Sequence, residues 1–211
     1  MLDVHAPHEE IHGVRDFFLH LFIITVGLLI ALSLEGLVEW RHHVHLRREA
    51  DANLRLEVED NRKDLASSLA AMPAEIKNLQ GIVAFLEERQ RGKTTVAHKL
   101  DLGMTISTLQ DSSWQTANAT GALSLMDYRH VQRYAAVYQL QKKLDTLQDA
   151  TFDPLLTLGA YLGAGSDTRG ITKEDATVAM LKVREVIAHL MAIRELGNGL
   201  DKTYAEALKP E

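Results

Sequence analysis

The feature that most constrains this chain is one long apolar run, FFLHLFIITVGLLIALSLEGLVEW, at residues 17–40. From Phe17 to Leu34 it contains no Asp, Glu, Lys or Arg. A buried core helix or the apolar part of a signal peptide usually offers only about 10 to 15 such residues. A helix over 17–38 would rise about 33 Å, which matches a hydrocarbon core of about 30 Å. The run therefore predicts a transmembrane helix over 17–38, with Trp40 at the interface.

A cleaved signal peptide is the competing interpretation, because Ala31-Leu32-Ser33 has the small-x-small pattern of a cleavage site. The residues before the run argue against it. Their only basic residue is Arg15, whereas export signals begin with a positively charged region. Their acidic residues are Asp3, Glu9, Glu10 and Asp16. We therefore expect an anchor that is retained.

The basic residues near the two ends of the span predict its orientation. Arg15 stands alone on the N-terminal side. The other side carries Arg41, Arg47, Arg48 and Arg55. Because positive residues stay in the cytoplasm, we expect a short extracytoplasmic tail over 1–16 and a cytoplasmic C-terminal domain. The absence of cysteine fits a reducing compartment but is weak support.

Polar and small residues share one stripe of the predicted span. At about 100° per residue, His20, Gly27, Ala31 and Glu35 lie within an arc of about 80°. The spacing from Gly27 to Ala31 allows close approach of two membrane helices and predicts self-association. His20 and Glu35 have two interpretations: an ionisable pair that lines a pathway in an oligomer, or two polar side chains that reach the headgroups. We favour the second.

The next segment, 39–92, predicts a long helix that continues from the span. Its apolar positions recur every three or four residues with one polar interruption, as in a coiled coil. The N-terminal part of this seam consists of Leu54, Val58, Asn61, Leu65 and Leu69. Asn61 either fixes the register or is solvated at the helix edge. Pro73 removes an intrahelical hydrogen bond, so we expect a kink or a break there.

The remaining segment, 93–211, predicts a helical bundle packed on the long helix. Apolar residues alternate from Leu100 to Ile106 but also fit a helical period, and we assign a helix from context. Trp114, Ala117 and Gly121 are expected on one helical face. Trp114 either binds a ligand or packs in the core, and we favour packing.

Local signals place the later helices. Asp127 is a good N-cap for the following helix, and Pro154 should bend or restart it. Thr172 should cap the last helix, which Gly197-Asn198-Gly199 should interrupt. The buried positions expected in this helix are Val183, Val186, Leu190, Ile193, Leu200 and Tyr204. With no convincing strand, the fold class is all-α.

Two pieces of the chain carry a resemblance: VGLLIALSLEGLVEWRHHVHLRREADANLRLEVEDNRKDL and WQTANATGALSLMDYRHVQRYAAVYQLQ. Together they resemble an uncharacterised family of bacterial single-span membrane proteins, in which such a span runs into a helical domain. The resemblance covers about half of the chain. It implies a bacterial inner-membrane location, and it supplies no reaction, ligand or catalytic residue.

The sequence carries no phosphate-binding loop, nucleophile elbow, cysteine cluster or paired-histidine zinc motif, so we expect neither an enzyme nor a cofactor. Histidines gather near the span, at His5, His8, His12, His20, His42, His43 and His45. Some have ligand spacing for zinc, but without a matching carboxylate or cysteine set we expect no metal site. The net charge of −6 disfavours nucleic-acid binding.

These observations predict a non-catalytic, membrane-anchored scaffold or interaction protein that self-associates through its span and through the heptad-like seam. Its partners would be the lipid bilayer, further copies of the chain and an unidentified protein. The alternative is an ion-conducting or pH-sensing assembly that uses the His20 and Glu35 stripe. A third hypothesis is an enzyme whose site is built from residues far apart in the sequence.

Overall fold

The computed structural model describes residues 13–93, 100–162 and 168–209. Every regular element in these ranges is helical, which confirms the all-α fold class. The α-helices are α1 (Val14–Gln90), α2 (Ser112–Ala119), α3 (Tyr128–Leu162) and α4 (Lys173–Ala207). Two short 3-10 helices are η1 (Ala122–Leu125) and η2 (Thr168–Gly170). The chain divides into two compact units, Met1–Arg48 and Glu49–Glu211, and α1 contributes to both.

The first unit contains the apolar part of α1. Among the described residues this is the one helical stretch long and apolar enough to cross a membrane. None of its most apolar stretch is buried within the chain. The large apolar side chains here are exposed on all sides of the helix, among them Phe17, Phe22, Ile24, Leu28 and Leu34.

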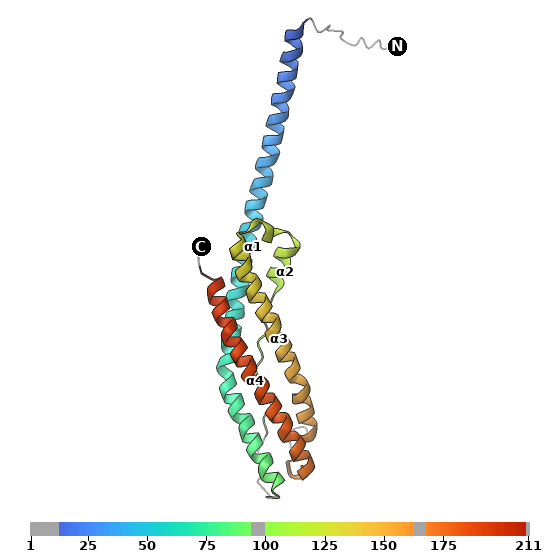
Figure 1. Cartoon of the computed structure of the whole chain (residues 1–211), viewed down its shortest axis with the longest axis vertical. Helices are drawn as coiled ribbons and strands as arrows, with labels where there is room; N and C mark the ends of the chain where they lie inside the picture. Colours follow the sequence, from blue (N-terminus) through green and yellow to red (C-terminus); the bar gives the residue numbers. More distant parts are fainter. Residues whose placement is uncertain (1–12, 94–99, 163–167, 210–211) are drawn as a thin grey trace, which may run out of the picture. The chain divides into compact units, whose positions relative to one another are not determined.

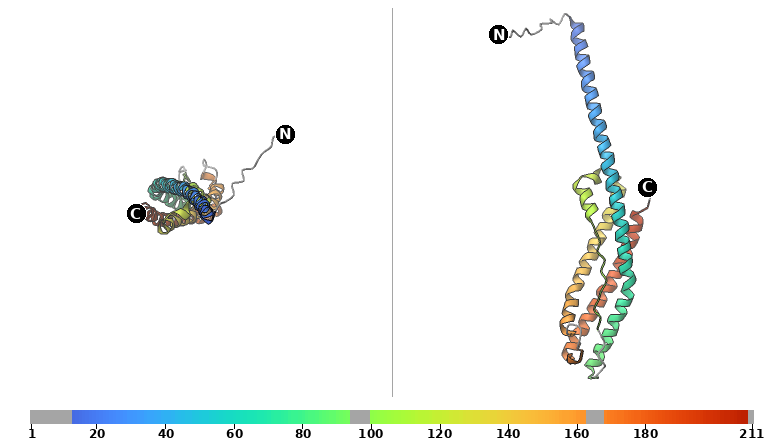
Figure 2. Two further views of the ribbon diagram at one scale, coloured as in Figure 1. Left: turned by 90° about the horizontal axis from the view of Figure 1, so that it is seen from above. Right: turned by 180° about the vertical axis from the view of Figure 1, so that it is seen from behind.

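The second unit is built on three long helical segments. Residues 49–90 of α1 lie beside α3 and α4 (Figures 1 and 2). Their apolar stripes meet in one core, because each helix repeats apolar residues at three- and four-residue spacing. Leu54, Val58 and Leu65 are buried on α1, and Tyr134, Val137 and Leu144 are buried on α3. All six apolar positions expected in the last helix are buried on α4.

Three polar contacts show that α4 runs antiparallel to α1. Arg55 donates to the Leu208 carbonyl oxygen at 2.9 Å. Arg62 pairs with Asp201 at 2.7 Å. Arg184, near the start of α4, pairs with Glu87, near the end of α1, at 3.1 Å.

The expected interruption at Gly197-Asn198-Gly199 is wrong, because α4 continues through these residues. Gly197 is buried where α4 meets α1. A Cβ atom at Gly197 would lie 2.9 Å from Leu69 Cδ2 and 3.4 Å from Leu65 Cδ1. The missing side chain therefore permits close helix packing and does not mark a flexible hinge.

The two prolines do not end helices, so of the expected kink or break at Pro73 and bend or restart at Pro154, the break and the restart do not occur. Both residues lie inside continuous helices. Each proline removes one intrahelical hydrogen bond, but packing of the flanking turns holds the helix together. Met72 and Ile76 are buried on either side of Pro73, and Pro154 is itself buried.

Both residues predicted to cap helix N-termini do so. The Asp127 carboxylate accepts from the backbone N–H of Arg129 at 2.9 Å, at the start of α3. The Thr172 hydroxyl accepts from the Asp175 N–H at 3.0 Å, which confirms it as the N-cap of α4. Gly121 is different: α2 ends at Ala119, and Gly121 has a positive φ of 76°. It therefore does not share a helical face with Trp114.

The helix assigned to the residues around Leu100–Ile106 is also wrong. Residues 100–111, here called the connecting segment, form neither helix nor strand. Their apolar alternation was the better signal, because alternate side chains on opposite sides indicate an extended chain.

Candidate functional site

The connecting segment lies along α1 and runs in the opposite direction. Asn78 Nδ2 donates to the Asp101 carbonyl oxygen at 2.6 Å. Further along, the Thr108 N–H donates to Asp64 at 2.7 Å and the Gln110 N–H donates to Asn61 at 2.8 Å. From Asp101 to Gln110 the segment matches about 26 Å of α1, or about 2.8 Å per residue. This is close to the rise of a β-strand, about 3.3 Å, so the segment is extended.

A polar stripe on α1 binds this segment and the start of α2. Its members recur at three-, four- or seven-residue steps and lie within an arc of about 100° on the helix. They are Glu57, Asn61, Asp64, Ser68, Glu75 and Asn78. Ser68 and Glu75 both contact the backbone of Thr105, at 3.2 Å and 2.8 Å. The stripe supplies the hydrogen bonds that a neighbouring strand would otherwise give to extended backbone.

Two side-chain amides bind the segment at two points each. Asn61 donates to the Gln110 carbonyl at 2.6 Å while its oxygen accepts from the Gln110 N–H. Gln148 of α3 does the same with Ser107, accepting at 3.0 Å and donating at 3.1 Å. Asn61 and Gln148 are both buried. Asn61 therefore binds the connecting segment and is not solvated at a helix edge.

Glu57 lies at the end of this stripe, and its carboxylate accepts three hydrogen bonds. One carboxylate oxygen accepts from the Ser112 hydroxyl and the Ser113 N–H, both at 2.8 Å. The other accepts from the Tyr138 hydroxyl at 2.7 Å. The Trp114 ring stacks on Tyr138, with centroids 5.1 Å apart. Glu57 thus connects α1, the start of α2 and α3.

The charges of this cluster follow from its hydrogen bonds. Burial of Glu57 raises its pKa, but the donors from Ser113, Tyr138 and Ser112 outweigh burial, so the pKa lies below its ordinary value. Burial raises the pKa of Tyr138, and the adjacent Glu57 carboxylate raises it further. The cluster therefore consists of an ionised carboxylate held by neutral donors.

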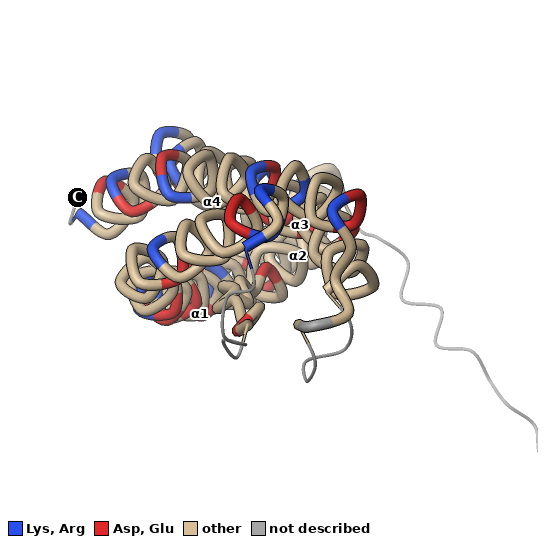
Figure 3. The backbone as a smooth tube through the Cα atoms, turned by 90° about the horizontal axis from the view of Figure 1, so that it is seen from below, with Lys and Arg blue, Asp and Glu red and all other residues tan. Residues whose placement is uncertain are grey.

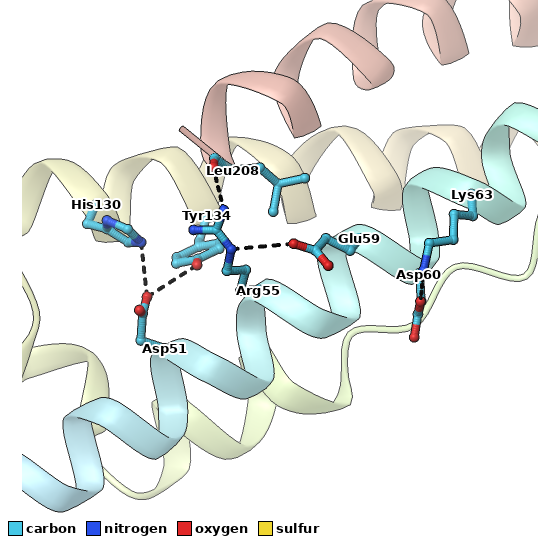
Figure 4. Close-up of polar contacts among 8 residues, drawn as sticks. All are labelled: Asp51, Arg55, Glu59, Asp60, Lys63, His130, Tyr134 and Leu208. Carbon is cyan, nitrogen blue, oxygen red and sulfur yellow. Dashed lines mark hydrogen bonds and ion pairs between the residues drawn. The ribbon is translucent and has the colours of Figure 1, made fainter. Parts of the chain in front are cut away.

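A second polar cluster connects α3 to α1 about two turns earlier (Figure 4). Asp51 contacts His130 Nε2 at 3.1 Å and accepts from the Tyr134 hydroxyl at 3.3 Å. Burial raises the pKa of Tyr134, and the charge of Asp51 adds to this effect. By contrast, Asp60 and Lys63 form an exposed pair on α1 alone.

The residues predicted to act in the span lie in the first unit. A Cβ atom at Gly27 would have no heavy atom within 4 Å apart from the adjoining backbone of its own helix, so the chain itself leaves this surface open. Ala31 and Glu35 are exposed, and His20 Nδ1 lies 2.8 Å from the Asp16 carbonyl oxygen. Along the helix His20 and Glu35 are about 22 Å apart, so they do not meet within one chain.

The predicted soluble seam lies inside the second unit. Leu54, Val58, Asn61 and Leu65 are buried, and Leu69 is half-buried. Leu65 and Leu69 border Gly197 of α4. The chain's own helices therefore occupy this seam.

The histidine groups do not form a metal centre in the described residues. His5, His8 and His12 lie outside these residues. The rings of His42 and His43 have centroids 6.2 Å apart, and His43 lies 3.9 Å from Glu39. In the ranges that the structure describes, no three His, Cys, Asp or Glu side chains gather closely enough to hold a metal ion.

Sequence reasoning missed the polar stripe and Glu57. The signal was present, because six polar residues repeat at helical spacing beside the apolar seam. Mixed polar residues on a helix usually indicate a solvated surface. For that reason the sequence alone did not indicate that these residues bind another segment of the chain.

Comparisons with known proteins give no relative: no family model, no curated protein and no solved structure matches the chain. The resemblance to single-span membrane proteins therefore stays a prediction, and the residues themselves carry the functional argument.

Proposed function

We propose that this chain is a non-catalytic, membrane-anchored helical scaffold or interaction protein that self-associates. The observation that carries the proposal is the uncovered apolar surface of the first unit. Phe22, Ile24 and Leu28 are 66%, 67% and 58% exposed. A continuous apolar surface of this length needs lipid or another apolar helix to cover it.

The proposed location is a bacterial inner membrane, with the N-terminal tail outside and the C-terminal domain in the cytoplasm. Arg41, Arg47 and Arg48 support this orientation, because basic residues are retained on the cytoplasmic side. A reporter fused to the C-terminus should be active only in a cytoplasmic form. Activity only in a periplasmic form would contradict the orientation.

Gly27 and Ala31 support self-association through the span. Both are small, lie one turn apart on one side of the helix and have open surroundings within the chain. The seam from Leu54 to Leu69 packs against the chain's own helices. We therefore assign self-association to the span and leave the outer surface of the second unit for an unidentified protein partner.

A non-catalytic role is supported by the use of the polar stripe. Glu57, Asn61 and Asp64 bind the connecting segment or the start of α2, so their polar atoms hold the fold together. Lys, Arg, Asp and Glu are interleaved on the helices (Figure 3), and the net charge is −6. A nucleic-acid partner would need a basic surface, so none is proposed.

The second candidate is an ion-conducting or pH-sensing assembly. It is favoured by two exposed ionisable residues, His20 and Glu35, on the same stripe as Gly27. Reconstituted protein would then show ion flux or assembly that changes with pH, and His20→Ala would abolish the change. Oligomers that survive His20→Ala without flux favour the scaffold.

The anchor itself is tested by washing membranes with carbonate, which releases peripheral proteins. The full chain should remain in the membrane, with its N-terminal residues intact. Release into the wash, or mature protein that begins near Leu34, would overturn the proposal.

A further inference from the structure

The second unit contains a cleft that the proposed scaffold role does not use. Its volume is about 520 Å³, within the range of about 300–1,000 Å³ typical of small-molecule sites. It lies between the end of the connecting segment, α2 and α3. Its lining includes Trp114, Tyr138, Gln141 and Asp145.

One wall of the cleft is aromatic and apolar. Trp114 stacks on Tyr138 with an interplanar angle of 23°, and Leu109 and Ala135 add aliphatic surface. Tyr138 is buried and bound to Glu57, whereas Trp114 is half-buried. Trp114 therefore offers indole surface to a ligand, and aromatic faces attract both apolar groups and cations.

The charged lining is acidic overall, with Asp111 and Asp145 against Lys142. Burial raises the pKa of Asp145, and the carboxylates of Asp149 and Asp111 raise it further. The carboxylates of Asp149 and Asp111 place negative charge near Asp145, which a bound cation would offset. The ammonium of Lys142 limits that negative charge, so the lining suits a ligand with one positive charge.

A buried amide supplies an independent sign of a ligand. Gln141 is 3% exposed, and its Nε2 donates to the Gln110 carbonyl at 3.0 Å. Its Oε1 is buried and has no hydrogen-bond partner among the described residues. A buried acceptor without a partner is uncommon. Gln141 lines the cleft, so a small rotation of its amide would present Oε1 to an N–H donor there.

We propose that this cleft binds a small organic amine with one positive charge. Asp111 and Asp145 hold its ammonium group, and Gln141 Oε1 accepts a hydrogen bond from one of its N–H groups. Trp114 packs against its apolar or aromatic body. All the lining residues belong to the second unit, so this site is independent of the membrane anchor.

The chain has two tryptophans, so the Trp40→Phe variant leaves Trp114 as the single fluorescent reporter. The full chain in mild detergent is titrated with phenethylamine, with its neutral analogue 2-phenylethanol and with phenylacetate. Phenethylamine should change the Trp114 emission in a saturable manner. Because 2-phenylethanol lacks the positive charge that strengthens these hydrogen bonds, it should bind at least about tenfold more weakly. Phenylacetate should not bind.

Asp145→Asn should weaken phenethylamine binding about tenfold, since it removes the charge and keeps the shape. Asp153→Asn is the matched control, because Asp153 is an exposed residue of α3 outside the cleft. Calorimetry on the unsubstituted chain should give the same order of ligands. The proposal is overturned if no saturable binding occurs, if 2-phenylethanol binds as well as the amine, or if the two variants bind alike.

Discussion

The Tyr138 hydroxyl of α3 donates to the buried Glu57 carboxylate of α1 over 2.7 Å. The other carboxylate oxygen accepts from Ser112 and Ser113 at the start of α2. One side chain thus holds three segments that are far apart in the sequence. The second unit consequently depends on polar contacts as well as on its apolar core.

Glu57→Gln should lower the free energy of unfolding by about 2 kcal/mol, because charge-assisted hydrogen bonds are lost and an amide N–H₂ then faces donors. The measurement is denaturant unfolding of the full chain in mild detergent, followed by its helical signal. Asp60→Asn is the control, because the Asp60 and Lys63 pair is exposed and should leave stability unchanged. Equal stability of both variants would contradict the role of Glu57.

The same carboxylate predicts a pH dependence. The pKa of Glu57 is lowered below 4.5 in the folded chain, so the unfolded chain binds more protons as this group titrates. Its stabilisation is complete above the unfolded pKa and is lost as the pH falls through the folded pKa. The stability difference between the unsubstituted chain and Glu57→Gln should therefore shrink in acid. A difference that stays constant as the pH falls through this window would refute the assignment.

Gln148→Glu should destabilise the second unit by about 1–3 kcal/mol, because a carboxylate oxygen would replace the N–H₂ that faces the Ser107 carbonyl. Gln148 is 5% exposed, so water does not compensate the loss. The control is Gln132→Glu, the same change at an exposed position of α3. If thermal unfolding shows equal stability for the two variants, the connecting segment is not held in this way.

Gly197→Ala should be less stable than Gly199→Ala by about 1–2 kcal/mol. Both substitutions improve helix propensity equally, so the difference isolates the contact with Leu69. A Cβ atom at Gly199 has no neighbour within 4 Å, whereas at Gly197 it lies 2.9 Å from Leu69 Cδ2. Denaturant unfolding in a Leu69→Ala background should close the gap. A gap that persists there would locate the cost elsewhere.

Much of the fold was predictable because the signals are local. Apolar spacing identified the buried positions of α4. Asp127 and Thr172 indicated where helices begin, because their own side chains accept hydrogen bonds from the first backbone N–H groups. The uncharged run from Phe17 to Leu34 identified the candidate span in the same way. Each of these features depends on residues within one helix.

The errors arose where distant residues decide the outcome. Gly197 resembled a helix breaker, but it lies inside α4 at a point where a side chain would collide with Leu69 of α1. The connecting segment is extended because its backbone bonds to Asn61 and Gln148, which flank it from α1 and α3. The cleft beside Trp114 combines three elements, so no sequence motif marks it.

The central claim, self-association through the span, is tested most directly by crosslinking the Gly27→Leu variant in native membranes. Gly36→Leu is the matched control: it makes the same substitution nine residues later, on the opposite side of the helix at about 100° per residue. Neither position has a neighbour within 4 Å in the chain, so neither change strains the monomer. We predict that Gly27→Leu loses the crosslinked oligomer while Gly36→Leu retains it. An oligomer that persists in Gly27→Leu would contradict the account.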